Sequence, residues 1–358
     1  DELGVYLQPE GSFWTHLGAG KPIDDFAIAE IQRTRETFGN HPSFLTFSTG
    51  NELRGSIPSL VELMLKGKGD ETRHLYTLGT NAWVFMSPKP TDDFSKLDFM
   101  NTKYTRNGDV RMGLKQIRPE PFSSTDFDFS TALIDLPVVA HEIGQHCVWP
   151  NFDETAKYTG PLKPKNYEIF HDWLVAAGLE NQWREFFMES GRLQTIMYKE
   201  EIEASLRTRG MAGFQLLGLN DFPGQGTALV GALDAFWDSK PYTSAAAYSR
   251  FCNQTVPLMR TRSRVIDKGT DFTAQIEVAH YGPHDLKDVR LDWDITKDGR
   301  RVASGSIEGV DLPTGSVTTV GEIEPSLNDV QVPSELKLEV RIAGTDFSND
   351  WKLWVMDQ

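Results

Sequence analysis

The chain has 358 residues, of which 39% are hydrophobic and 11% aromatic, enough for packed cores in about two domains. Its 36 Lys and Arg against 51 Asp and Glu give a formal net charge of −15 without a basic cluster, so we expect no nucleic acid partner. No apolar run approaches the roughly 20 residues that span a bilayer, and the first residues lack the pattern of a signal peptide, so we expect no membrane association.

Up to about residue 245, short strand-like runs alternate with longer amphipathic stretches, which is typical of βα units around a parallel sheet. Stretches 23–38 and 167–190 are predicted to be helices, and the aromatic residues of the second are expected in the core. Six strands are expected where a complete (β/α)8 barrel has eight. They are 4–8, 43–50, 75–83, 97–104, 136–143 and 213–219.

Two of these runs end on a glutamate. Glu52 closely follows the run 43–50, and Glu142 lies at the end of the run 136–143. In a (β/α)8 barrel the catalytic side chains stand at the carboxyl ends of different strands, so glutamates far apart in sequence can face each other across one pocket. A glycosidic bond is cleaved with retention by two carboxyl groups, one acting as acid and base and the other as nucleophile. The pair therefore indicates a retaining glycosidase.

After about residue 245 the apolar residues recur with period two, as in 272–278, between turn signals such as Asp298-Gly299. This pattern predicts an antiparallel β-sandwich of roughly immunoglobulin size over 246–358, following a barrel domain over 1–245. Such a sandwich can bind carbohydrate, but supporting the barrel or an oligomer is the commoner role.

The cysteines, Cys147 and Cys252, could form at most one disulfide, and no Cys/His group has the spacing of zinc ligands. We therefore expect neither a structural metal nor a cofactor. Cys147 lies close after Glu142, and a lone cysteine there is expected to be a small buried hydrophobe rather than a nucleophile.

Three segments carry a resemblance to a known family. They are the start Asp1-Glu2-Leu3-Gly4-Val5-Tyr6-Leu7, the pair Asn40-His41-Pro42-Ser43 and Gly50-Asn51-Glu52, and the segment Ala140-His141-Glu142-Ile143-Gly144. In this order they resemble barrel strand three, the acid/base motif of strand four and the nucleophile segment of strand seven in glycoside hydrolase family 2. That family is the β-galactosidase, β-glucuronidase and β-mannosidase group of clan A, and the resemblance covers about residues 1–240.

The resemblance implies that Glu52 is the general acid and base, that Glu142 is the nucleophile, and that Asn51 binds the sugar 2-hydroxyl. The implied activity is that of an exo-acting, β-galactosidase-like enzyme that removes terminal sugars from oligo- or polysaccharides through a covalent glycosyl-enzyme intermediate. The sugar stays open, because galactose, glucuronic acid and mannose differ by single hydroxyls or a carboxylate that loop residues read.

Further contacts to the carbohydrate substrate are expected from polar and aromatic residues after the predicted strands. They are Glu10, Trp14 and His16 after strand three, Asn81 and Trp83 after strand five, His141, Gln145, His146 and Trp149 with strand seven, and Asn220, Asp221 and Gln225 after strand eight.

The chain departs from the family pattern at three places. Many β-galactosidases bind magnesium through a glutamate and a histidine of strand three; His16 matches the histidine, but Trp14 stands at the glutamate, so we expect no metal. Leu217 stands where strand eight usually provides a tryptophan floor, so the sugar platform must be rebuilt. Strands one and two have no counterpart, and their loss would expose two sheet edges. Either the chain is part of a longer polypeptide, or another chain, as in a homo-oligomer, completes the barrel, or the shortened form folds alone.

Two other functions stay open. One is a non-catalytic carbohydrate-binding or assembly protein derived from a glycosidase, and the other is a transglycosylase that shields the intermediate from water. The separation of the two carboxyl groups discriminates between mechanisms, because about 5–5.5 Å indicates retention and about 6.5–9.5 Å inversion. Since glycan-degrading relatives are often exported, we expect a periplasmic or secreted protein.

Overall fold

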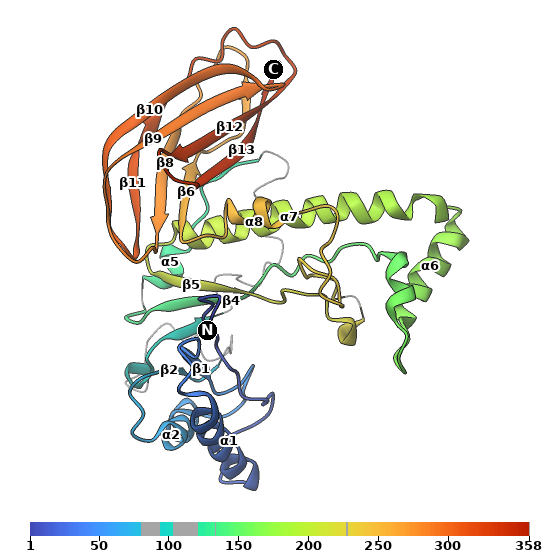
Figure 1. Cartoon of the computed structure of the whole chain (residues 1–358), viewed down its shortest axis with the longest axis vertical. Coiled ribbons are helices and arrows are strands. Elements are labelled where there is room, and N and C mark those ends of the chain that lie inside the picture. Colours follow the sequence, from blue (N-terminus) through green and yellow to red (C-terminus); the bar gives the residue numbers. More distant parts are fainter. Residues whose placement is uncertain (80–93, 103–120, 133, 227, 358) are drawn as a thin grey trace. The chain divides into compact units, whose positions relative to one another are not determined.

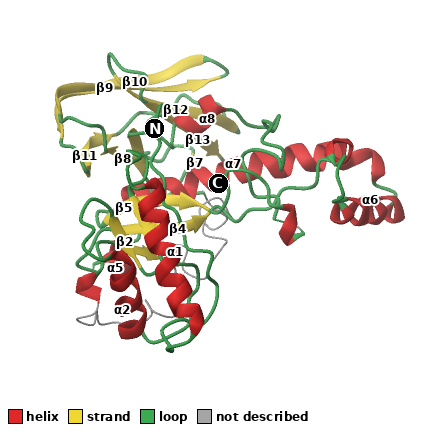
Figure 2. Ribbon diagram, turned by 60° about the horizontal axis from the view of Figure 1, so that its bottom comes forward, coloured by secondary structure: helices red, strands yellow, loops and turns green. Residues whose placement is uncertain are grey.

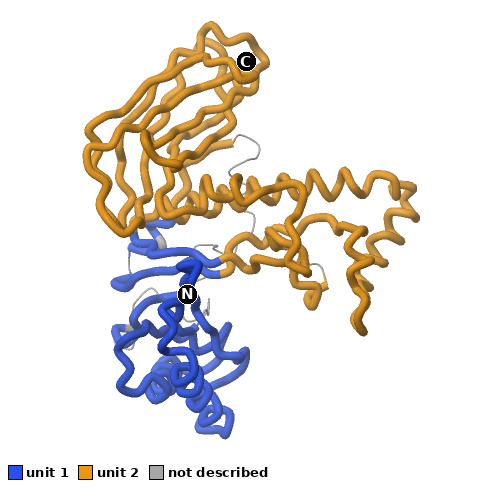
Figure 3. The backbone as a smooth tube through the Cα atoms, viewed as in Figure 1, with its two compact units in different colours: residues 1–108, 127–141, 210–215 blue, residues 109–126, 142–209, 216–358 orange. Residues whose placement is uncertain are grey.

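The protein is described by a computed structural model over residues 1–79, 94–102, 121–132, 134–226 and 228–357. Its chain divides into two units (Figure 3). The first unit comprises residues 1–108, 127–141 and 210–215, and the second comprises residues 109–126, 142–209 and 216–358. The predicted domain boundary between residues 245 and 246 falls inside the second unit and stays a prediction.

The first unit contains short parallel strands and two long helices (Figures 1 and 2). Strand β1 (Thr46–Ser48) pairs in parallel with β2 (Leu75–Thr77). The first residues of the chain run parallel to β1 through isolated bridges, such as that between Leu7 and Phe44. Helices α1 (Pro22–Phe38) and α2 (Ile57–Lys68) pack their apolar faces into the same core as these strands. Alternation of strand and helix therefore gives the parallel pairing that the sequence predicts.

The rest of the first unit includes the short helices η1 (Phe94–Lys96) and α5 (Asp128–Thr131). A second sheet has the order β3 (Met100–Thr102), β4 (Val138–Ile143) and β5 (Met211–Leu216), and its first two strands are parallel. Both β4 and β5 begin in the first unit and end in the second.

The observed strands are shorter than the predicted runs. Within the described ranges, the run 4–8 makes only a bridge, 43–50 contains three strand residues, and the sheets of this unit have two and three strands. The runs 75–83 and 97–104 extend beyond the described residues. The structure is therefore a mixed α/β fold with several sheets, and a complete eight-stranded barrel is not seen in the described part of the chain.

The predicted helix 167–190 is wrong as a single element. Helix α6 (Lys165–Ala177) ends before the left-handed Gly178, whose φ is 69°, and a short 3-10 turn η3 (Glu180–Gln182) precedes α7 (Trp183–Arg207). The N–H groups of Gly178 and Leu179 bond to the last carbonyls of α6, which closes the helix end. Phe187 is buried as expected, but Trp173 is 61% exposed, so its expected place in the core is wrong.

The second unit ends in two sheets that share one apolar core (Figure 1). One sheet has the order β10-β9-β12-β13-β7 and the other the order β11-β8-β6. The strands are β6 (Thr255–Arg260), β7 (Val265–Asp267), β8 (Ala274–His280), β9 (Leu286–Lys297), β10 (Arg300–Leu312), β11 (Ser316–Ile323), β12 (Ser334–Ile342) and β13 (Ser348–Met356). The pairs are antiparallel as predicted, except that β13 and β7 are parallel. The remaining short helices are η2 (Phe152–Lys157), η4 (Pro223–Gln225) and α8 (Ala245–Ser249).

A buried charge joins α7 to this sandwich. The carboxylate of Glu203 has no solvent exposure and accepts hydrogen bonds from Arg207 at 2.7 Å, Asn349 at 2.8 Å and Trp351 at 3.0 Å. It also contacts Lys199. Burial pushes the pKa of Glu203 upward, but the charges of Lys199 and Arg207 hold it below its usual value. The group therefore stays ionised and fully hydrogen-bonded inside the unit.

We expect Glu203→Ala to destabilise the protein by about 3–5 kcal/mol, because it leaves the equally buried Arg207 without its carboxylate. Urea unfolding followed by circular dichroism measures the change. Glu189→Ala on the same helix is the matched control, since that side chain is 60% exposed. Equal stability of the two variants would contradict the assigned role of Glu203.

Candidate active site

Glu52 lies directly after the parallel strands of the first unit. The backbone N–H of Asn51 donates to the carbonyl of Phe13 at 2.9 Å, and that of Arg54 donates to Thr15 at 2.9 Å. These bonds hold the 50–54 segment against the early part of the chain. Both Asn51 and Glu52 are half-buried, so they stay accessible from solvent.

The residues expected around strand three lie along this same segment. The indole Nε1 of Trp14 donates to Oε2 of Glu52 at 2.8 Å, and Trp14 is 69% exposed. Glu10 is bridged to Ser48 and His16 to Arg54, and both side chains are exposed. The structure thus joins Trp14 to Glu52, the predicted acid, by a hydrogen bond, and it pairs Glu10 and His16 with residues before and after Glu52.

Glu142 stands near the end of β4. It is half-buried, and the neighbouring His141 is 9% exposed with its Nδ1 2.8 Å from Oε1 of Gln215 on β5. The side chain of His141 is therefore fixed by the adjacent strand. In this fixed position, the imidazole of His141 is suited to orienting polar groups near Glu142.

Both glutamates have a left-handed backbone conformation. Within the described ranges, the residues other than glycine with positive φ are Glu52 at 47°, Glu142 at 51°, Trp237 at 70°, Asp288 at 49° and Asp298 at 48°. The left-handed region costs a non-glycine residue about 1–2 kcal/mol, and such strain gathers at functional sites. Four acidic residues of the described ranges have this conformation, and both glutamates that the motifs select are among them.

A buried carboxylate on α7 supports the loop after Glu142. Glu201 accepts the backbone N–H of Gly144 at 2.6 Å and contacts Nε2 of His146 at 3.1 Å. Gln194 lies nearer the start of α7, and its side-chain amide donates to the backbone carbonyl of His146 at 2.6 Å. His146 is 8% exposed, so the structure assigns it to the support of the loop.

Sequence reasoning missed this support. Gln194, Tyr198 and Glu201 recur at helical spacing in the middle of α7, and all three side chains are buried and bonded to loops that flank the site. Tyr198 donates to the carbonyl of Val230 at 2.6 Å. The signal that could have identified these residues is their spacing, because polar residues at positions i, i+4 and i+7 share one face of a long helix.

A pocket in the second unit is lined by four of the residues discussed from sequence. Gln145, Cys147, Leu217 and Gln225 line a cavity of about 420 Å³ together with Ala228 and Val230. Leu217 is the residue that replaces the expected tryptophan floor. The cavity combines amide groups with apolar walls, as a sugar subsite requires.

Asp221 has a different environment from the one expected. Its side chain is 2% exposed and accepts a hydrogen bond from Lys240 at 2.7 Å and from the N–H of Gly231 at 2.9 Å. Asn220 donates to the carbonyl of Asp221. These contacts give Asp221 a structural role in joining two loops, and its expected contact with substrate stays a prediction.

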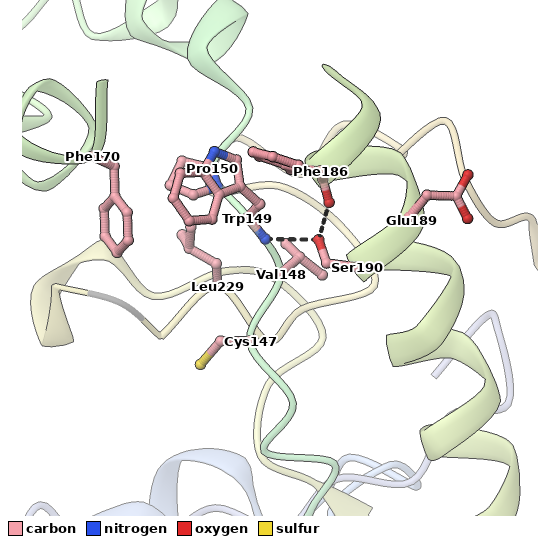
Figure 4. A pocket seen from close by; sticks show the side chains of 9 residues that line it. All are labelled: Cys147, Val148, Trp149, Pro150, Phe170, Phe186, Glu189, Ser190 and Leu229. Carbon is pink, nitrogen blue, oxygen red and sulfur yellow. Dashed lines mark hydrogen bonds between the residues drawn. The ribbon is translucent and has the colours of Figure 1, made fainter. Parts of the chain in front are cut away.

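Trp149 packs among other aromatic rings (Figure 4). Its ring centroid lies 5.1 Å from that of Phe170 and 5.8 Å from that of Phe186, both edge to face. Its backbone N–H donates to Oγ of Ser190 at 2.9 Å. With Leu229 and other neighbours it lines a largely apolar cavity of about 480 Å³. Trp149 thus forms a wall of this cavity rather than an isolated platform.

Asn81 and Trp83 lie outside the described residues. Within the described ranges, no group of three His, Cys, Asp or Glu side chains could hold a metal ion, and no helix is both long and apolar enough to cross a membrane. Cys147 and Cys252 are both free and exposed, so the expectation of a buried Cys147 is wrong.

Comparisons with known proteins give matches to both parts of the chain. Residues 270–357 match the family described as "Domain of unknown function (DUF8488)". Over 215 residues the chain is 25% identical to the β-galactosidase large subunit of Latilactobacillus sakei, covering 49% of this chain and 33% of that protein.

Solved structures of two enzymes are similar to the whole chain. The complex of the Amycolatopsis orientalis exo-chitosanase with PNP-β-D-glucosamine is 13% identical with a TM-score of 0.51, covering 100% of this chain and 43% of that chain. The FMN-binding β-glucuronidase of Facaelibacterium prausnitzii is 12% identical with a TM-score of 0.42, covering 100% and 48%. The exo-chitosanase match supports a common fold. This chain spans a third of the length of the curated relative and less than half of either solved structure.

We expect Gly144→Ala to destabilise the second unit by about 2–4 kcal/mol, because a Cβ there would lie 1.8 Å from the ring of Tyr198 and the φ of Gly144 is 80°. Thermal unfolding measures the loss. Gly160→Ala is the matched control, since a Cβ at Gly160 meets no atom within 4 Å. If both substitutions shift the melting temperature equally, the close packing of α7 on the loop is not what stabilises it.

Another buried carboxyl group, that of Glu154, follows Trp149 in the sequence. It is 2% exposed and accepts a hydrogen bond from the hydroxyl of Tyr167 at 3.0 Å. Burial raises its pKa from 4.5 to about 7, and the nearby carboxylates of Asp234 and Asp221 add to the rise. In the unfolded chain the same group ionises at its ordinary pKa.

This difference predicts a pH dependence of stability. Between about pH 4.5 and 7 the folded state keeps a proton that the unfolded state has lost, so the free energy of unfolding falls as pH rises and levels off above 7, by about 3 kcal/mol in total. Glu154→Gln should remove this dependence and be the more stable protein at pH 8. Urea titrations at pH 5 and pH 8 test it, with the exposed Glu168→Gln as control. Parallel pH profiles for wild type and Glu154→Gln would refute the prediction.

Proposed function

We propose that the chain is the catalytic part of a retaining, exo-acting β-glycosidase of the β-galactosidase type, in which Glu52 is the acid and base and Glu142 the nucleophile. The observation that carries the proposal is the coincidence of motif, position and strain. Each glutamate follows or ends a parallel strand, as its motif predicts, and each is held at a positive φ.

The comparisons support the same class of reaction. The sequence relative is named as a β-galactosidase large subunit, and the structure similar in fold with a TM-score of 0.51 is named as an exo-chitosanase. The short parallel strands of the first unit are consistent with part of a (β/α)8 barrel of glycoside hydrolase family 2, and we propose that the remaining strands belong to a longer polypeptide or to another chain.

In the proposed reaction the carboxylate of Glu142 attacks the anomeric carbon while Glu52 donates its proton to the oxygen of the departing group. The bond between the anomeric carbon and that oxygen breaks, and a covalent glycosyl-enzyme ester forms. Glu52, now ionised, takes a proton from water, and the water oxygen displaces Glu142 to release the sugar in its original configuration. Both carboxyl groups return to their starting states.

Neighbouring side chains have separate tasks. We propose that Asn51, next to Glu52 in the sequence, binds the sugar 2-hydroxyl, and that the indole N–H of Trp14 orients the carboxylate through its 2.8 Å hydrogen bond. The amides of Gln145 and Gln225 line the cavity that we propose for sugar hydroxyls. The proposed partner is therefore a carbohydrate, and the proposed compartment is the periplasm or the exterior.

We expect Glu142→Gln to lower kcat/KM on the best of a panel of nitrophenyl β-glycosides by at least about a thousandfold. Glu52→Gln should lower it by about 10²–10⁴-fold. The measurement is release of nitrophenol at pH 5–8. Glu62→Gln on α2 is the control, because Glu62 is an exposed glutamate paired with Lys66. Retention is tested by NMR of the first sugar released, which should be the β-anomer.

Azide assigns the two roles. With Glu52→Ala, azide should attack the glycosyl-enzyme and give a β-glycosyl azide, whereas with Glu142→Ala it should replace the nucleophile and give an α-glycosyl azide. Binding without hydrolysis by a well-folded wild type would favour the carbohydrate-binding alternative. Sugar transfer to an acceptor in place of hydrolysis would favour the transglycosylase.

A further inference from the structure

One strained residue outside the proposed catalytic site is an exposed tryptophan. Trp237 has a φ of 70° and is 62% exposed. A bulky aromatic side chain in the left-handed region is a genuine outlier, because glycine or asparagine would adopt this conformation at lower cost. An exposed indole gains little from burial that could offset the strain.

The turn that carries Trp237 is braced on both sides. The carboxylate of Asp234 accepts the N–H groups of Phe236 at 2.8 Å and Asp238 at 3.0 Å, and the N–H of Trp237 donates to the carbonyl of Asp234 at 3.1 Å. Lys157 bridges Asp234 and Asp238. The conformation at Trp237 is therefore imposed by its surroundings, and the indole is presented on a rigid tip.

The same turn is fastened to the segment that follows β5. The N–H of Leu233 donates to the carbonyl of Leu219 at 2.9 Å, and the N–H of Asp221 donates to the carbonyl of Leu233 at 3.0 Å. Lys240, beyond the turn, pairs with Asp221 at 2.7 Å. The tip thus belongs to the loops that also carry Gln225 of the cavity proposed for sugar hydroxyls.

The groups exposed around Trp237 indicate which class of ligand can bind there. The indole offers a flat apolar face, and its turn carries the partly exposed ring of Phe236 together with charged groups, because Asp238 is 67% exposed and Lys157 is 36% exposed. A protein interface would need a wider apolar patch around its aromatic anchor. A pyranose ring fits better, since its C–H face packs on the indole while its hydroxyl groups reach carboxylate and ammonium groups.

We propose that Trp237 is a carbohydrate-binding platform that stacks on a pyranose ring of a glycan chain. The pyranose ring that stacks on Trp237 belongs to a different sugar of the glycan from the terminal sugar that Glu52 and Glu142 release. This inference rests on the proposed function only for the class of ligand, and it adds a binding position for a second sugar of the oligo- or polysaccharide. The strain at Trp237 is then retained because the indole is used.

The test is Trp237→Gly in the full chain, with affinity electrophoresis on soluble β-galactan, β-mannan and glycol chitosan. Glycine relieves the strain, so the melting temperature should equal or exceed that of the wild type, while affinity for the retained polysaccharide should fall about three- to tenfold. Trp237→Phe should keep most of the affinity. Trp173→Ala is the control, because Trp173 is 61% exposed on α6 at ordinary helical geometry.

The outcomes separate this inference from the catalytic one. Unchanged affinity in Trp237→Gly, an equal loss in Trp173→Ala, or no retention of the wild type by any of the three polysaccharides overturns the platform. A change in sedimentation mass with Trp237→Gly would assign the indole to self-association and also overturn it. Weakened binding in Trp237→Gly supports the platform whether or not nitrophenyl glycosides are hydrolysed, so failure of catalysis is recognised independently.

Discussion

The carboxylate of Glu203 lies wholly out of water in the second unit, and an ionised group in that position is tolerated only because its partners are buried with it. Arg207 comes from the same helix, whereas Asn349 and Trp351 come from the last strand of the sandwich. The helix therefore cannot move relative to this strand without taking the amide of Asn349 and the indole N–H of Trp351 away from the buried carboxylate. That requirement fixes α7, and the rest of the second unit is arranged around it.

The next contacts along α7 lead from the sandwich to the loop after Glu142. Glu203 and Glu201 lie within a single turn of α7, and Glu201 accepts the N–H of Gly144. The backbone at Glu142 needs such support, because a left-handed glutamate relaxes unless its neighbours determine its conformation. The buried cluster around Glu203 thus helps to hold Glu142 in position, and the proposed role of Glu142 as nucleophile depends on that position.

The sequence was informative wherever a pattern was local. The motifs selected Glu52 and Glu142 because a short apolar run followed by an acid is readable in a few residues, and the amphipathic pattern predicted a helix over 23–38, one residue short of the observed start of α1. Contacts between distant residues were not readable. The support by Glu201, and the hydrogen bond from Trp14 to Glu52, depend on which segments the fold brings together. The predicted strands were too long for the same reason, since apolar residues continue past the paired backbone.

The shared helix has an evolutionary consequence. Because α7 carries the partners of both the sandwich and the loop of Glu142, recombination that exchanged the sandwich alone would leave Glu203 facing foreign side chains. A viable exchange between related genes has to take the helix and the sandwich together as one cassette. Residues on the two sides of α7 are consequently expected to change in concert.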